Sequence, residues 1–171
     1  MLKFKVGELL TRDTGSLERY EIDTSYNFPD NDPKLLANLK GEVILIKTTQ
    51  GINAEISNFK TEVELNCSRC LEKYPQTIKI PSMEEHFYTS KPKGIKPTEE
   101  ISFIDMKHHE IDLSELIRQE IISSYDMIPV CKKDCKGLCS KCGQNLNKKT
   151  CKCDKSGPTN KPFANLKNLL K

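Results

Sequence analysis

Residues 61–66, Thr61-Glu62-Val63-Glu64-Leu65-Asn66, decide the fold, because apolar and polar side chains alternate along them. Such alternation is typical of a β-strand with one face on a core and the other in water. Short strand patterns recur on both sides, over residues 2–6, 42–47, 52–56, 77–80 and 101–105. Gln50-Gly51 and Ser57-Asn58 are turn-forming pairs between them. Short strands with short connections predict an antiparallel, largely meandering sheet.

One main helix is expected beside this sheet. After Asp112, a typical N-cap residue, Leu113, Leu116, Ile117 and Ile121 recur at helical spacing. A shorter helix is expected over residues 33–39, with Asp32 as N-cap, Pro33 at the first position and Gly41 just past the end. The chain is therefore interpreted as an α+β protein, with a β-rich domain over residues 1–130 and a small tail over residues 131–171.

The composition of the 171-residue chain indicates the cellular compartment in which it works. The longest aliphatic run, Val43–Ile46, is far too short to cross a bilayer, and residues 1–6 lack the apolar core of a signal peptide. We therefore expect a cytoplasmic protein without a membrane partner. Thiols are kept reduced in the cytosol, so the eight cysteines are interpreted as metal ligands before disulfides.

The tail contains the strongest chemical signal. Cys139-Ser-Lys-Cys142-Gly143 is followed by Cys151-Lys-Cys153. Zn²⁺ prefers four thiolate or imidazole ligands in a tetrahedron, and a Cys-x-x-Cys turn presents two of them to one ion. Gly143 permits a left-handed turn just after the second cysteine. We predict a zinc site at these four cysteines, with an iron–sulfur cluster as the alternative and disulfides only in an oxidising compartment.

The four remaining cysteines allow a second site. Cys67 and Cys70 lie between two predicted strands, whereas Cys131 and Cys135 begin the tail. These two pairs could meet in a second four-sulfur centre, so one zinc ion is expected and two are possible. Alternatively, Cys67 and Cys70 are small, partly buried thiols in a turn. A redox pair is disfavoured, because a thioredoxin-like Cys-x-x-Cys begins a helix and these residues precede a strand pattern.

The tail is strongly basic. Residues 131–171 carry eleven Lys and two acidic residues, a net charge of +9. Such a surface favours an anionic partner, of which RNA is the commonest large one, although a solvated Lys-rich surface is the plainer alternative. With one aromatic residue in the tail, the expected contacts are to phosphates rather than to stacked bases. The residues proposed for them are Lys132, Lys133, Lys136, Lys141, Lys148, Lys149 and Lys152.

Several motifs together resemble a known family. Asn66-Cys67-Ser68-Arg69-Cys70-Leu71-Glu72 resembles the Cys-x-Arg-Cys-Leu-Glu signature of the bacterial YceD family, which also occurs in plant organelles. Residues 111–121 are similar to its central helix. The cysteine-rich stretch from Pro129 to Asn147 is similar to the tail of one branch, and residues 160–166 to the closing segment. The resemblance covers roughly residues 40–171.

This resemblance implies a factor needed for accumulation of large-subunit (23S) ribosomal RNA. The expected partners are that rRNA or a pre-ribosomal particle, with a ribosomal protein as a further candidate. Catalytic motifs and phosphate-cradling glycine loops are missing from the sequence, so we expect neither an enzyme nor a small-molecule substrate. The alternatives are an adaptor that binds a protein through the zinc knot formed by its cysteine-rich tail and, with less support, a thiol redox protein. Residues 162–170 predict a terminal amphipathic helix that docks on its own core or on a partner.

Overall fold

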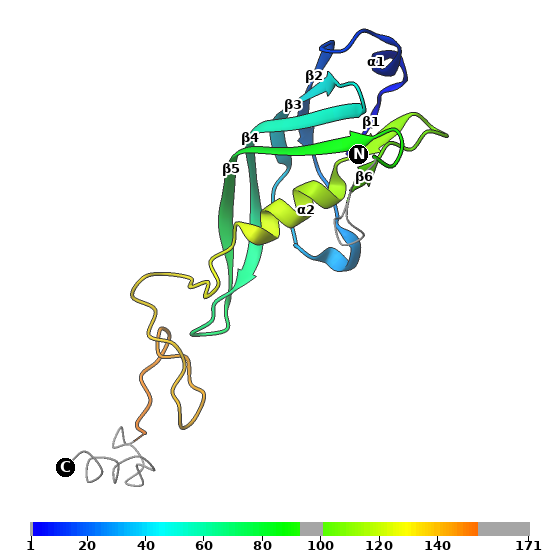
Figure 1. Ribbon diagram of the computed structural model, residues 1–171. Coiled ribbons are helices and arrows are strands. Elements are labelled where there is room, and N and C mark those ends of the chain that lie inside the picture. Colours follow the sequence, from blue (N-terminus) through cyan, green and yellow to red (C-terminus); the bar gives the residue numbers. More distant parts are fainter. Residues whose placement is uncertain (1, 93–100, 154–171) are drawn as a thin grey trace, which may run out of the picture.

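A computed structural model describes residues 2–92 and 101–153 of the chain. Its main element is a five-stranded sheet, shown in Figure 1, with the strand order β2-β3-β4-β5-β6. The strands are β2 (Leu17–Thr24), β3 (Leu39–Lys47), β4 (Gly51–Asn66), β5 (Lys73–Tyr88) and β6 (Ser102–Phe103). Neighbours in β2 to β5 are antiparallel, whereas β6 pairs in parallel with the end of β5.

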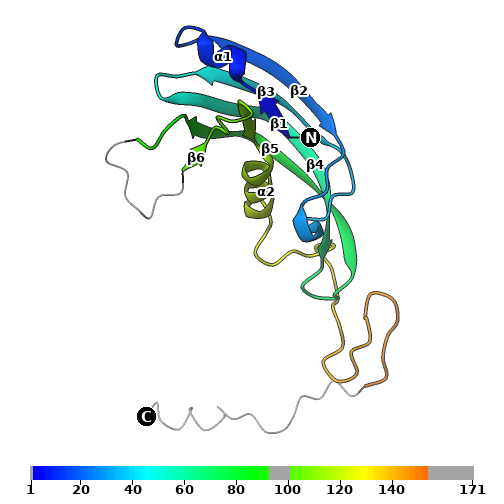
Figure 2. The same ribbon diagram turned by 90° about the vertical axis from the view of Figure 1, so that its right-hand side faces the viewer.

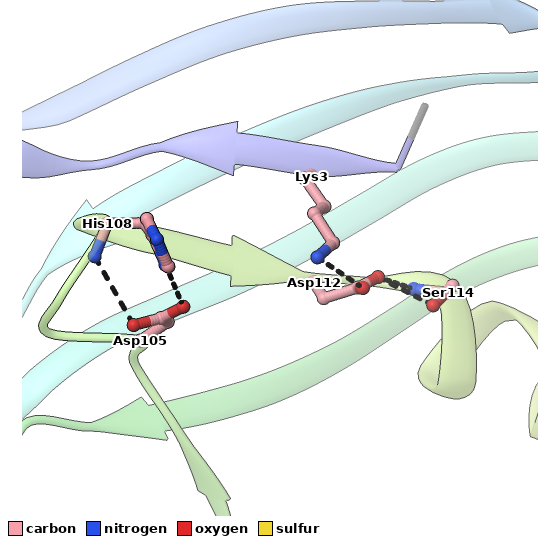
Figure 3. A network of polar contacts seen from close by, with 5 residues as sticks. All are labelled: Lys3, Asp105, His108, Asp112 and Ser114. Carbon is pink, nitrogen blue, oxygen red and sulfur yellow. Dashed lines mark hydrogen bonds and ion pairs between the residues drawn. The ribbon is translucent and has the colours of Figure 1, made fainter.

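A small second sheet leads into the main helix. β1 (Lys3–Lys5) pairs antiparallel with β7 (Glu110–Asp112), and α2 (Ser114–Ser123) follows directly. Figure 3 shows Asp112 at this junction, where its Oδ1 accepts hydrogen bonds from the Ser114 backbone N–H at 2.9 Å and the hydroxyl at 2.6 Å. This side chain satisfies backbone groups at the start of the helix that have no partner within it. The predicted helix is therefore confirmed, but its N-cap is Leu113 rather than Asp112, because the Leu113 carbonyl accepts the first intrahelical hydrogen bond, from the Ile117 N–H at 3.0 Å.

The core lies between the concave face of the sheet and α2. Figure 2 shows the strands arching over α2. The buried residues of this helix are Ile117 and Ile121. Both side chains are fully buried, as are Val43, Ile56 and Phe59 on the strands. The alternation predicted for residues 61–66 holds for its first half, where Thr61 and Val63 are buried and Glu62 between them is only half-buried. The short elements α1 (Gly7–Thr11) and η1 (Pro29–Asn31) complete the chain trace.

Strands β4 and β5 are much longer than predicted. They stay paired from Gly51–Tyr88 to Asn66–Lys73 without a change of register, and their far ends project beyond the other strands (Figure 1). The predicted turn at Ser57-Asn58 was therefore wrong. Asn58 has a left-handed backbone with a φ of 53°, which this residue type tolerates, so the strand continues through this position instead of reversing. We call the projecting pair, residues 60–79, the hairpin arm.

The helix predicted for residues 33–39 was also wrong. This segment runs extended beside the hairpin arm, where Leu36 N–H donates to the Glu62 carbonyl at 2.7 Å and Glu64 N–H to the Lys34 carbonyl at 2.9 Å. The Lys34 ammonium lies 3.1 Å from the Glu64 carboxylate. A helix of so few residues is marginal by itself, so backbone pairing with an existing strand determines the conformation.

The β-rich, mostly antiparallel α+β architecture agrees with the sequence interpretation, with two α-helices in the part of the chain that is described. The terminal helix predicted for residues 162–170 lies outside the described residues. Among the helices that can be placed, none has both the length and the apolar character needed to span a membrane. The division at residue 130 stays a prediction.

Candidate metal centres

The structure brings all eight cysteines together in two groups of four. Cys67, Cys70, Cys131 and Cys135 form one group, which we call the hairpin centre. Cys139, Cys142, Cys151 and Cys153 form the other, which we call the tail centre. Within each group the sulfur atoms all lie within 4.8 Å of one another, and none of the cysteines forms a disulfide. Both ligand sets named from the sequence are thus assembled, and either could hold a metal ion.

The hairpin centre ties the tail to the tip of the hairpin arm. Cys67 and Cys70 lie in the turn between β4 and β5, whereas Cys131 and Cys135 follow α2 by several residues. The Sγ atoms of Cys67 and Cys135 are 3.8 Å apart, and those of Cys70 and Cys131 are 3.7 Å apart. A regular tetrahedron with metal–sulfur bonds of about 2.3 Å separates its sulfurs by about 3.8 Å. The geometry therefore fits one thiolate-bound ion.

Both Cys-x-x-Cys pairs use the same backbone turn. In the tail centre the Gly143 N–H donates to the Cys139 carbonyl at 2.9 Å, and Gly143 has a φ of 70°. In the hairpin centre the Leu71 N–H donates to the Cys67 carbonyl at 2.9 Å, and Leu71 has a φ of 59°. The left-handed turn predicted at Gly143 is confirmed. A leucine in this conformation is strained, so the surrounding centre must hold the turn in place.

Polar groups around the hairpin centre fix its ligands. The Asn147 side-chain amide donates to Cys135 Sγ at 3.3 Å, and its oxygen accepts from the Lys136 N–H at 2.9 Å. The Arg69 guanidinium donates to the Cys135 carbonyl at 3.2 Å, and the Arg69 carbonyl accepts from the Leu138 N–H at 3.1 Å. Such outer partners orient metal ligands and are part of a site. Sequence reasoning missed these roles, although Arg69 and Asn147 lie within the motifs that carry the resemblance.

Gly137 allows the tail to lie close to the arm. Its φ is 71°, and a Cβ there would lie 3.1 Å from the Arg69 carbonyl oxygen. Tyr74, Val130 and Leu138 pack around the buried cysteines of the hairpin centre, in a cluster separate from the main core. The tail therefore contacts the arm over a small area, mostly through its backbone and its sulfurs.

The thiols of the hairpin centre have very different proton affinities. Burial raises the pKa of Cys67, but hydrogen bonds to the backbone of Cys131, Cys70 and Arg69 outweigh burial and lower this pKa to about 6. Burial, followed by contacts with the neighbouring cysteines, raises the pKa of Cys131 to about 12. The Cys67 thiolate thus forms readily and hinders ionisation of Cys131. A divalent cation would favour the thiolate form of all four groups.

The tail centre repeats this electrostatic pattern. Hydrogen bonds from the backbone of Cys142 and Lys141 lower the pKa of Cys139 to about 6. The side chain of Cys142 and then burial raise the pKa of Cys153 to about 12. Unlike Cys67, Cys142 is exposed to solvent. An ion in the tail centre would therefore be more open to exchange and to chelators than one in the hairpin centre.

The seven lysines named from the sequence surround these centres, and all are exposed. Lys148 pairs with the Glu72 carboxylate at the tip of the arm, which raises the pKa of its ammonium. In the described part of the chain, the other six make no ion pair with a carboxylate within 4.0 Å. Lys148 thus already has a partner, whereas the rest present their charge to solvent.

Comparison with known proteins places this arrangement in a family. Residues 57–170 match the family described as large ribosomal RNA subunit accumulation protein YceD. The chain belongs to the YceD family. The match includes the hairpin arm, α2 and both metal centres, and it confirms the resemblance drawn from the motifs.

Two plant proteins are similar to this YceD-family chain, and both are named large ribosomal RNA subunit accumulation protein YCED homolog 1, chloroplastic. The Arabidopsis thaliana protein is 40% identical over 60 residues, which cover 35% of this chain and 18% of that protein. The Zea mays protein is 31% identical over 114 residues, which cover 52% of this chain and 39% of that protein. The chain thus spans less than half of either relative. No solved structure is significantly similar to it.

Proposed function

We propose that this protein is a non-enzymatic factor in ribosome biogenesis that promotes accumulation of large-subunit (23S) rRNA, and that it acts in the cytoplasm. The family match supports the ribosomal role. The observation that carries the mechanism is the pair of cysteine centres, which fold a lysine-rich tail and fasten it to the hairpin arm. The protein would bind the rRNA or a pre-ribosomal particle through this tail.

We infer that both centres hold Zn²⁺. Sulfur separations of 3.7 and 3.8 Å in the hairpin centre suit a single tetrahedral ion. An iron–sulfur cluster would place its own iron and sulfide atoms between the cysteine sulfurs and so suits this spacing less well. Zinc would supply structural cross-links that stabilise the folded tail.

The charge of the metal-bound tail favours RNA. Residues 131–171 carry a net +9; their six thiolates and two Zn²⁺ ions add about −2, and the Cys67 and Cys70 thiolates of the arm add about −2 more, so about +5 remains for the tail with both centres. The exposed lysines Lys132, Lys133, Lys136, Lys141, Lys149 and Lys152 would contact phosphates, while Lys148 is held by Glu72. Phosphate contacts give affinity and strong salt dependence, with little sequence preference.

The test is the ratio of 23S to 16S rRNA, with ribosomal subunit profiles, in cells depleted of the protein and complemented with variants. We expect a selective fall in 23S rRNA, restored by the wild type and by Lys148→Gln but not by Lys132→Gln with Lys133→Gln and Lys136→Gln. An unchanged ratio on depletion would remove the proposal. Native mass spectrometry should show two zinc ions, with one lost in Cys142→Ser.

An adaptor function is the second candidate, because apolar side chains near the hairpin centre are exposed. Met127 is 100% exposed, Ile128 70% and Leu71 67%. Exposed apolar residues of this size are common at protein-binding surfaces. In this case the tail would grip a ribosomal protein, and crosslinks from the tail would go to that protein instead of rRNA. Full complementation by the triple lysine variant would favour the adaptor.

A further inference from the structure

Three lysines stand in one row across the outer face of the sheet. Lys40 of β3 is directly opposite Lys60 of β4, and Lys60 is directly opposite Lys79 of β5. Residues in direct register lie on the same face of a sheet, with Cβ atoms about 4.5–5.5 Å apart. All three are exposed, and they lie on the face opposite the buried Phe59 and Ile80. We call these three residues the lysine row.

Most of the charge of the lysine row has no counter-charge nearby. The Lys40 ammonium lies 3.1 Å from the Asp23 carboxylate. Within residues 2–92 and 101–153, no carboxylate lies within 4.0 Å of the ammonium of Lys60 or Lys79. Glu62 is two residues farther along β4, roughly 7 Å away. Two adjacent strands thus present unneutralised positive charges to each other.

This arrangement opposes the usual pairing in sheets. Like charges directly opposite each other destabilise a pair of strands, whereas opposite charges stabilise it. A departure from such a local rule is expected where a surface has a binding role. The row departs from the rule twice, at Lys40–Lys60 and at Lys60–Lys79.

The surroundings of the row are open and offer further donors. A depression of about 340 Å³ adjoins it, lined among others by Lys40, Lys60, Asn38 and Thr77, and also by Glu62. On the outer side of β5, pairing with β6 in the described chain begins only at Phe87, so no strand covers Lys79. The Asn38 amide already donates to the Asp23 carboxylate at 2.8 Å, so the lysine ammonium groups and the Thr77 hydroxyl are the donors that remain for phosphate oxygens.

We propose that the lysine row binds the phosphate backbone of RNA that crosses strands β3, β4 and β5. The inference rests on the proposed function and extends its binding surface beyond the tail. The row spans two strand spacings, about 10 Å, which suits two or three neighbouring phosphates. Lys60 is six residues from Asn66 at the tip of the arm, about 20 Å along the strand, so one RNA can contact both the row and the tail.

The test compares Lys60→Gln/Lys79→Gln with a matched control, Lys5→Gln/Lys107→Gln, which removes two exposed lysines elsewhere. Binding to a 23S rRNA transcript is titrated from about 50 to about 200 mM salt. Each lost phosphate contact lowers the slope of log K against log salt by about 0.7–0.9. The advantage of wild type over the row variant should therefore be about 7- to 12-fold larger at the lower salt. The control should keep the wild-type slope.

Folding is checked by thermal unfolding, in which the row variant should have a Tm no lower than wild type, because a like-charge contact has been removed. A row variant with the wild-type slope, while Lys132→Gln/Lys133→Gln lowers it, would overturn this inference alone. A wild-type protein that fails to bind the transcript would overturn the proposed function as well. Row variants that keep the RNA slope but lose an acidic ribosomal protein would assign the row to that protein instead.

Discussion

Cys135→Ser should release the beginning of the tail from the hairpin arm while leaving the sheet folded. The substitution removes a sulfur that lies 3.8 Å from Cys67 Sγ and accepts a hydrogen bond from Asn147. With three ligands left, the hairpin centre should lose the Zn²⁺ ion that we propose for it. The tail centre uses four other cysteines and should keep its own.

The remaining contacts are too weak to hold this segment. The hydrogen bonds Ser68–Pro129, Arg69–Cys135 and Leu138–Arg69 each contribute about 1 kcal/mol. The exposed Lys148–Glu72 ion pair contributes at most about 1 kcal/mol. Ordering the backbone costs about 1–2 kcal/mol per residue. These contacts, together with the packing of Leu138 in the cysteine cluster, therefore offset the ordering of only a few residues, fewer than residues 131–138.

The assay is amide hydrogen exchange on the full-length protein, with native mass spectrometry to count ions. In the wild type, the Cys135 N–H donates to the Lys132 carbonyl and the Leu138 N–H to the Arg69 carbonyl. In Cys135→Ser, the amides at positions 135 and 138 should exchange as in an unstructured peptide. Amides of β3 and β4 should stay protected, because the main core is separate from the cysteine cluster. Ser140→Ala, an exposed change in the same tail, is the control.

Cys142→Ser should affect the tail centre and leave the hairpin centre intact. It should expose the Cys139 and Gly143 amides and release one ion, while the Leu138 amide stays protected. Unchanged protection of residues 131–138 in Cys135→Ser would refute the reasoning, because the metal would then not hold this segment. Loss of both ions in either variant would show that the two centres do not act separately.

Three further outcomes follow from the described contacts. Ile117→Ala on α2 should lower the free energy of unfolding by about 2–5 kcal/mol in urea titrations, whereas the exposed Gln119→Ala should change it by less than about 0.5 kcal/mol. Gly137→Ala should speed release of metal from the hairpin centre to a chelator relative to wild type, whereas Gly143→Ala should leave the hairpin centre unaffected, because only a Cβ at residue 137 would lie 3.1 Å from the Arg69 carbonyl oxygen; equal release from the hairpin centre in both variants would contradict this. The Asp105 carboxylate, 2.6 Å from His108 Nδ1 (Figure 3), raises the pKa of His108, so its NMR titration should shift to lower pH in Asp105→Asn. Because the folded-state pKa is raised, the pair stabilises the fold below about pH 6.5, and this contribution is lost as the pH rises through the folded value.

The sequence predicted the local pattern of the strands better than their lengths. Alternation identified residues 61–66 and 77–80, but Ser57-Asn58 was interpreted as a turn because these residue types favour turns. The structure accommodates them inside β4, where Asn58 takes the left-handed conformation opposite β5. Pairing along the whole of β5 outweighs the local preference. Residues 33–39 show the same effect, since pairing with the arm replaces the predicted helix.

The cysteine sets could be predicted because spacing within each Cys-x-x-Cys pair is a local property. Joining Cys67 and Cys70 to Cys131 and Cys135 required the fold, because the two pairs are more than 60 residues apart and α2 lies between them. The second-centre hypothesis is therefore supported by proximity that the sequence only suggested. The lysine row could not be predicted, because cross-strand neighbours depend on a register that is set by the core.

The uninterrupted register of β4 and β5 also restricts how this architecture can change during evolution. Adding one residue to either strand between the lysine row and the tip would turn every following side chain to the other face, and the tip cysteines with them. Orientation is preserved only when both strands gain or lose residues together, two at a time. Each such step would change the separation of row and tip by about 7 Å. The length of the hairpin arm can therefore change only in steps of two residues per strand. Each step would require a matching change in the distance between the two places where the binding partner contacts the row and the tail.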